Sequence, residues 1–112
     1  MRIGIPVAAG RCSSHFGRCE QFAMVDADRQ SGQILQTEWV QAPSHEPGML
    51  PGWLAEQGVN VVITGGMGPR AQDLLAGHGI SVVLGVAEVD PQDLVSQYLE
   101  GSLTPGQNIC DH

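Results

Sequence analysis

The sequence predicts a single α/β domain, residues 1–112, in which three helices cover a mixed sheet of five strands. The first forty residues contain three strand-like segments with no helical pattern between them, which predicts an antiparallel meander. The remainder alternates helical patterns with short apolar segments at residues 59–64 and 80–84, which is typical of parallel strands joined by helices. Of the 112 residues, 42% are apolar, enough for one mostly aliphatic core.

The first half of the chain is predicted to form three strands. Residues 2–7 are a buried strand, although Pro6 removes one donor from its ladder. Residues 8–18 contain Gly, Ser, Cys and His and are predicted as a loop. Residues 21–26 form the second strand, and a polar turn that ends in Ser-Gly separates it from the third strand at residues 34–40.

The third strand alternates in polarity, which predicts the direction of its side chains. Leu35, Thr37 and Trp39 are expected to face the core. Gln36 and Glu38 are expected to face water.

The second half begins with a loop at residues 42–48, which contains two prolines. Leu50, Trp53 and Leu54 then recur at helical spacing, which predicts a short helix over about residues 51–57. The fourth strand and a second helix follow this element.

A glycine-rich turn at residues 65–68 links the fourth strand to that second helix. Pro69 suits the first helical position, and Gly77 or Gly79 is expected to end the helix. The predicted apolar stripe consists of Ala71, Leu74 and Leu75.

The third helix is predicted to begin at Pro91 with Asp90 as its cap, and to end at Gly101. Residues 102–112 are expected to form an irregular tail. The buried face of this helix is expected to contain Leu94, Val95, Tyr98 and Leu99.

The composition excludes several classes of protein. Twelve acidic residues against five arginines and no lysine give a net charge of −7, which disfavours binding to nucleic acid. Three cysteines, an odd number, argue against a secreted disulfide framework. Because no apolar run reaches the length of a membrane span and the N-terminus is a poor signal peptide, we expect a cytoplasmic protein that does not bind membranes.

The predicted topology gathers several loops at one edge of the sheet. If the predicted strands are numbered along the chain, their expected order is 3-2-1-4-5, with right-handed crossovers between the parallel strands. The loops after strands one, three, four and five then lie at the same edge. Open α/β sheets bind ligands beyond the carboxyl ends of their strands, where the direction of growth switches, so we expect a site between strands one and four.

The glycine turn is a candidate anion site, with Gly65, Gly66, Met67, Gly68 and Arg70 as the candidate contacts. A helix N-terminus offers free backbone donors, and glycines let an anion approach closely. The alternative is that the glycines simply form a tight turn. The turn is not a phosphate-binding P-loop, because the Lys-Ser/Thr ending is missing.

The candidate metal ligands carry sulfur or imidazole donors, which suit iron, zinc, copper and metal–sulfur clusters. They come from three parts of the chain: His15 and Cys19 from the first loop, His45 from the second, and Cys110 and His112 from the tail. Each has an ordinary alternative, such as a hydrogen bond to loop backbone or a disordered terminus. The role of a further cysteine of the first loop, Cys12, stays open.

An enzymatic role finds less support in the sequence. No nucleophile and base can be assembled convincingly, although Cys19 with His15 or His45 could form a thiolate nucleophile. The interiors of strands one and four lack the carboxylates that a two-metal nuclease needs. We therefore expect a binding protein that is not an enzyme.

Four motifs together resemble the dinitrogenase iron–molybdenum cofactor biosynthesis family. They are Ser14-His15-Phe16-Gly17-Arg18-Cys19, His45-Glu46-Pro47-Gly48, Gly65-Gly66-Met67-Gly68-Pro69-Arg70-Ala71 and Asn108-x-Cys110-x-His112.

The resemblance implies a ribonuclease H-like three-layer fold and a carrier or chaperone for an anionic metal–sulfur cluster. The cluster would be the iron–molybdenum cofactor, its precursor, or the molybdenum–copper sulfide cluster of the orange protein branch. His15, Cys19, His45, Cys110 and His112 match positions that could ligate it, and the glycine turn matches a cradle for it. The alternative function is a protein–protein adaptor of a multiprotein complex, without a cofactor of its own.

Overall fold

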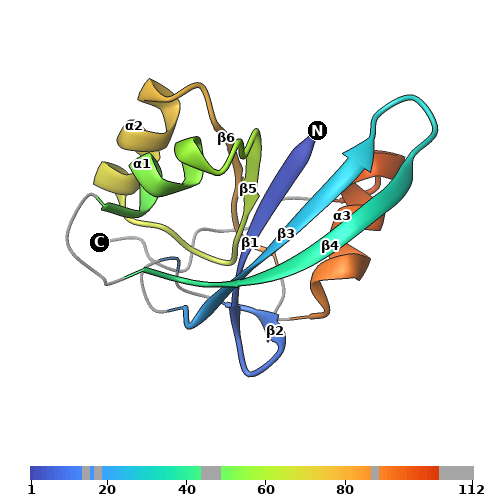
Figure 1. Ribbon diagram of the computed structural model, residues 1–112, viewed down its shortest axis with the longest axis horizontal. Helices are drawn as coiled ribbons and strands as arrows, with labels where there is room; N and C mark the ends of the chain where they lie inside the picture. Colours follow the sequence, from blue (N-terminus) through green and yellow to red (C-terminus); the bar gives the residue numbers. More distant parts are fainter. Residues whose placement is uncertain (14–15, 17–18, 44–48, 87–88, 104–112) are drawn as a thin grey trace.

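The computed structural model describes residues 1–13, 16, 19–43, 49–86 and 89–103. A mixed sheet crosses the molecule, with helices on both of its faces (Figure 1). The elements follow one another as β1 (Arg2–Ala8), β2 (Arg11–Cys12), β3 (Gln21–Asp28), β4 (Gln33–Gln41), α1 (Met49–Glu56), β5 (Val61–Ile63), α2 (Pro69–Gly77), β6 (Ser81–Val83) and α3 (Pro91–Glu100).

The α/β class is confirmed, and the sheet differs from the expected one by one short strand. Its six strands run in the order β4-β3-β1-β5-β6, with β2 paired to β1 off this path. The pairs β1–β3 and β3–β4 are antiparallel, whereas β1–β5 and β5–β6 are parallel. The carboxyl ends of β1, β4, β5 and β6 therefore lie at one edge, as the meander and the crossovers predict.

The extra strand, β2, lies inside the segment that was predicted to be only a loop. It forms a hairpin with β1, in which Ala8 lies opposite Arg11. The two residues between the strands, Ala9 and Gly10, have positive φ angles of 54° and 79°. This pattern suits a tight hairpin turn, because its backbone twist matches that of the strands.

Two apolar cores lie on opposite faces of the sheet, so the fold has three layers. Helices α1 and α2 cover one face and α3 covers the other (Figure 1). The core under α3 contains Ile3, Ile5, Val7, Cys12, Ala23, Val25, Val61, Ile63, Val86, Leu94 and Val95. The core under α1 and α2 contains Phe16, Cys19, Phe22, Met24, Leu50, Leu54, Val59, Val62, Met67, Leu75 and Ile80.

Gly4 of β1 lies against the second of these cores. A Cβ atom at this position would lie 3.4 Å from Val59 Cγ1 and 3.7 Å from Leu54 Cδ2. These are ordinary van der Waals distances, so Val59 and Leu54 lie close over the backbone of the central strand at this position.

The predicted side-chain directions in β4 are wrong for two residues. Leu35 is 66% exposed and Trp39 is 47% exposed, although both were expected to face the core. A bulge interrupts the ladder: Ile34 lies opposite Ala27 and Gln36 lies opposite Asp26, so Leu35 has no partner on β3. Because β4 is also an edge strand, no neighbouring strand among the described residues covers its outer side.

The helix boundaries follow the predicted signals closely. The Asp90 carboxylate accepts a hydrogen bond of 2.9 Å from the Gln92 amide, and Gly101 ends α3 with a φ angle of 79°. Helix α1 begins at Met49, two residues earlier than expected. Within the described part of the chain, none of the helices is long and apolar enough to cross a membrane.

Candidate functional site

The first loop and the glycine turn lie against one another at the expected edge of the sheet. The amide of Phe16 donates a hydrogen bond of 3.0 Å to the carbonyl of Gly66. The amide of Gly65 donates one of 3.2 Å to the carbonyl of Ser13. The loops after strands one and four of the prediction are thus joined by backbone hydrogen bonds.

Thr64 is a buried polar residue beneath this junction. Its side chain is fully buried at the end of β5. The hydroxyl group lies 3.3 Å from the Ser13 carbonyl oxygen and 3.4 Å from the Gly66 carbonyl oxygen. A single hydroxyl therefore holds the backbone of both loops in place.

The end of β4 approaches the same edge. The Ala42 amide donates a hydrogen bond of 3.0 Å to the Glu20 carbonyl, and the Glu20 amide donates one of 3.1 Å to the Val7 carbonyl. The loop after β4 therefore starts beside the end of the first loop, close to Cys19. Three segments far apart in the sequence converge here, as the topology predicts.

Helix α2 begins at this edge and presents its N-terminus there. Gly68 occupies the cap position with no side-chain hydrogen bond, and Pro69 is the first helical residue. There is no acidic residue in the first turn. Arg70 is exposed, and an added Cβ at Gly68 would meet nothing within 4 Å. This helix start combines open space, positive partial charge and a cationic side chain, which together suit an anion.

Core packing and a side-chain hydrogen bond fix the turn before α2. The Met67 side chain is 1% exposed and belongs to the core under α1 and α2. The Gln72 side-chain amide donates a hydrogen bond of 3.1 Å to the Met67 carbonyl. Five residues of this turn were predicted to contact an anion. Of these, Met67 packs its side chain into the core, and Gly65 and Gly66 are buried.

Cys19 lies at the site but points into the core. Its side chain is 2% exposed and packs in the cluster that contains Phe16 and Phe22, whose ring centroids are 5.9 Å apart. Burial raises the pKa of the Cys19 thiol from 9.0 to about 12, and a backbone hydrogen bond offsets this only partly. The thiol is therefore neutral at physiological pH, which disfavours a thiolate nucleophile.

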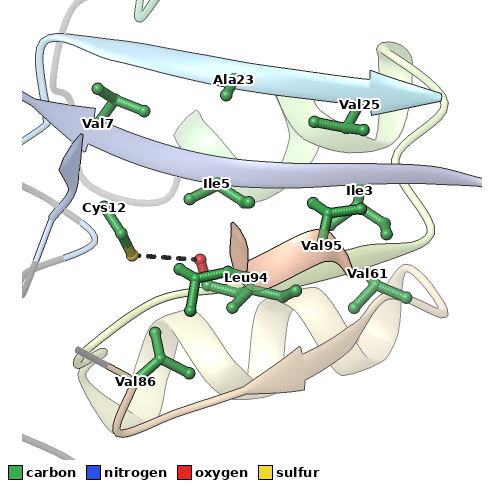
Figure 2. Close-up of a cluster of buried hydrophobic side chains, with 11 residues drawn as sticks. Ile3, Ile5, Val7, Cys12, Ala23, Val25, Val61, Val86, Leu94 and Val95 are labelled. Carbon is green, nitrogen blue, oxygen red and sulfur yellow. Dashed lines mark hydrogen bonds between the residues drawn. The ribbon is translucent and has the colours of Figure 1, made fainter. Parts of the chain in front are cut away.

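Cys12, whose role the sequence left open, belongs to the opposite core. It is 2% exposed, and its Sγ lies 3.9 Å from the Ile63 carbonyl oxygen (Figure 2). Its neighbours in Figure 2 are aliphatic side chains of the sheet and of α3. Cys12 behaves here as a small buried apolar residue.

Four predicted ligands lie outside the described residues, namely His15, His45, Cys110 and His112. Their metal-ligand role stays a prediction. Among the residues that the structure describes, no group of three His, Cys, Asp or Glu side chains is arranged to hold a metal ion. Ser13 and Phe16, the described residues on either side of residues 14–15 in the sequence, are both bonded to the glycine turn.

Two positioning residues were missed in the sequence, Ser13 and Thr64. Ser13 contributes its carbonyl group, which any residue would supply, so no sequence signal marks it. Thr64 carried a signal, because it is a polar residue between the apolar run of β5 and Gly65. A hydroxyl at the end of a fully buried strand needs a partner, and the adjoining loop is the place to look for one.

A family model and one curated relative match nearly the whole chain. The family model described as dinitrogenase iron-molybdenum cofactor matches residues 1–101. The uncharacterized protein MJ0580 of Methanocaldococcus jannaschii is 32% identical over 109 residues, which cover 92% of this chain and 89% of that protein.

Two solved structures share the fold over nearly the full chain. The crystal structure of PH0822 has a TM-score of 0.84 and 33% identity, and covers 94% of each chain. The apo form of the orange protein from Desulfovibrio gigas has a TM-score of 0.73 and 26% identity, and covers 96% of this chain and 93% of that one.

Proposed function

The chain belongs to the dinitrogenase iron–molybdenum cofactor family, and from this premise we propose that it is a non-catalytic cytoplasmic carrier of an anionic metal–sulfur cluster. The cluster is its cargo. It contains molybdenum with iron or with copper, and it binds at the edge of the sheet where α2 begins.

The observation that supports this proposal best is the uncapped start of α2. The cap position has no side chain, the first turn has no acidic residue, and Arg70 is exposed beside it. Backbone amides at such a position carry positive partial charge and seek an acceptor. On a chain with a net charge of −7, this is a local exception to the acidic surface.

The described residues fit an anion better than they fit a bare cation. A cation site needs several deprotonated ligands, and the described thiol at this edge, Cys19, holds its proton with a pKa of about 12. The sulfides of a thiometallate cluster accept hydrogen bonds and bring their own negative charge. In our proposal the amides at the start of α2 and the Arg70 side chain hold this charge, and His15 or His45 adds a direct bond to the metal.

A substitution at Gly68 can block the proposed anion site at the start of α2 without disturbing the fold. Gly68→Asp places a carboxylate at the cap, where it accepts hydrogen bonds from the same amides and repels an anion. Gly68→Ala is the matched control, because a Cβ at this position meets nothing within 4 Å and leaves the amides open.

The probe is tetrathiomolybdate, presented anaerobically with and without Cu(I), followed by gel filtration and measurement of bound molybdenum and visible absorption. We expect the unmodified protein and Gly68→Ala to retain molybdenum, and Gly68→Asp to bind at least about tenfold more weakly. Unfolding in urea should show that Gly68→Asp is as stable as the unmodified protein or more so, since it gains a cap.

The proposal fails if the unmodified chain retains no molybdenum under these conditions and none after anaerobic isolation from its native cell. It also fails if Gly68→Asp binds as tightly as Gly68→Ala, because the start of α2 would then not contact the cargo.

A further inference from the structure

We infer that Phe16 is a positioning residue of the proposed site, because its buried ring holds the first loop against the glycine turn. Between Ser13 and Cys19 the structure describes Phe16 alone. The inference rests on the proposed function, since the first loop is bonded to the turn that leads into α2.

The backbone of Phe16 is bonded directly to the glycine turn. Its amide donates a hydrogen bond of 3.0 Å to the Gly66 carbonyl. Every residue except proline carries such an amide, so this bond alone does not call for a phenylalanine. It also contributes little net stability, because in the unfolded chain both groups bond to water instead. What keeps this amide in place must therefore come largely from the side chain.

The Phe16 side chain is seated in the core under α1 and α2, and it is only 4% exposed although it belongs to a loop. Its ring packs edge-on against that of Phe22 in β3, with 5.9 Å between the centroids and 74° between the planes. Aromatic pairs in this arrangement are stabilised beyond the area that they bury. Phe22 in turn contacts Trp53 of α1, with 5.5 Å between the centroids. The ring therefore attaches the first loop to the sheet and, through Phe22, to α1.

The glycine turn buries a large side chain in the same core. Met67 is 1% exposed and belongs to the cluster that contains Phe16. It directly follows Gly66, whose carbonyl accepts the bond from the Phe16 amide. Each of the two segments thus buries a large side chain at or next to the residue through which they are bonded. Together these contacts fix the position of one segment relative to the other.

The ends of the first loop are held by contacts that do not involve the ring. The Ser13 carbonyl accepts a hydrogen bond from the Gly65 amide and is approached by the Thr64 hydroxyl. At the other end, the Glu20 amide donates a hydrogen bond to the Val7 carbonyl. Loss of the ring should therefore release the middle of the loop and leave its ends attached.

The position of this loop matters for the proposed site. His15, which directly precedes Phe16 in the sequence, is a candidate for the direct bond to the metal. Binding groups must be held within about 0.5 Å of the productive geometry by neighbours whose own side chains are locked by packing. Phe16 supplies this support from within the core.

The test compares Phe16→Ala with Ile3→Ala. Both substitutions leave a cavity in a core and lower the global stability. Ile3 is fully buried in the opposite core, and Figure 2 shows it at the end of β1 away from Val7 and Cys12. Phe16→Leu, which removes the ring but keeps apolar bulk, is the second variant in case Phe16→Ala does not fold.

The measurements are urea unfolding, anaerobic equilibrium dialysis with tetrathiomolybdate, and hydrogen exchange of single amides. We expect Phe16→Ala to bind tetrathiomolybdate at least about fivefold more weakly than the unmodified protein, and Ile3→Ala to bind within about twofold of it. In Phe16→Ala the amide of residue 16 should exchange at least about tenfold faster relative to the amides of β1, because the loop opens locally. The Gly65 amide should keep its relative protection, and Ile3→Ala should change neither ratio.

The inference is overturned if Phe16→Ala and Phe16→Leu bind as tightly as the unmodified protein. It is also overturned if Phe16→Ala and Ile3→Ala weaken binding equally, because global stability would then explain the loss. Should the unmodified chain itself bind no tetrathiomolybdate, the proposed function fails. The exchange at residue 16 then decides on its own whether the ring holds the loop.

Discussion

The hydroxyl group of Thr64 lies 3.3 Å from the carbonyl oxygen of Ser13, and this contact joins the end of β5 to the loop that follows β2. The two residues are 51 positions apart in the sequence. The same hydroxyl also approaches the Gly66 carbonyl oxygen, so the first loop and the glycine turn share one buried anchor.

Replacing Thr64 with Val should loosen this anchor without changing its shape. In this variant the Ser13 carbonyl still accepts a hydrogen bond from the Gly65 amide, and the Gly66 carbonyl still accepts one from the Phe16 amide. Only the hydroxyl donor that the two carbonyls share is lost. We expect Thr64→Val to lower the free energy of unfolding by about 1 kcal/mol. Urea unfolding measures this loss, and hydrogen exchange should quicken at the Gly65 and Phe16 amides.

Thr64→Ser is the control for the role of the hydroxyl group. It loses a buried methyl group and some stability with it, but it keeps the donor. Exchange at the Gly65 and Phe16 amides should therefore stay slow relative to global unfolding. Equal acceleration in the Ser and Val variants would contradict the anchoring role.

The Cys19 thiol should make stability dependent on pH in the alkaline range. Its pKa is about 12 in the folded protein against 9.0 ordinarily, so the folded state holds the proton more tightly. The contribution is fully present below pH 9 and is lost as the pH rises from about 9 towards 12. Cys19→Ala should flatten the fall of unfolding free energy above pH 9, and an identical slope in the variant would contradict the burial of this thiol.

Arg70 should contribute to cargo binding through its charge. Arg70→Gln removes one positive charge beside the start of α2, and we expect a several-fold weaker retention of tetrathiomolybdate with a smaller dependence on salt. Arg29→Gln, in the turn between β3 and β4, makes the same change in net charge away from the site. If both variants weaken binding equally, overall charge rather than a local contact is responsible.

The hairpin turn between β1 and β2 should tolerate Asn better than its natural residue. Ala9 has a φ angle of 54°, a left-handed conformation that costs most side chains about 1–2 kcal/mol. Asn adopts this conformation readily and commonly precedes Gly in such turns. We expect Ala9→Asn to raise the free energy of unfolding by about 0.5 kcal/mol, measured in urea. Ala76→Asn, at an exposed position of helix α2, should lower it.

The sheet and the meeting of its loops could be predicted because they follow from patterns along the chain. The β-branched run before Gly65 indicates a buried strand, and Pro69 and Asp90 mark helix starts that the structure confirms. Once the strand directions are known, the first loop and the glycine turn must share an edge.

The features that the sequence analysis predicted wrongly or missed depend on contacts that no local pattern encodes. The direction of Leu35 is set by a bulge, which arises from the fit between two strands and changes the alternation at that point. The pairing of β2 depends on a left-handed Ala9, a conformation that Ala rarely adopts. The burial of Cys19 depends on how Phe16 and Phe22 pack around it. The sequence shows a thiol in a loop but not which way it points.

The glycine turn is held on both sides by hydrogen bonds and from beneath by Met67. The backbone amides at the start of α2 are therefore already oriented before an acceptor reaches them, and the chain has little conformational entropy left to lose. Preorganisation of this kind strengthens binding, because no segment of the turn has to be ordered when an acceptor arrives.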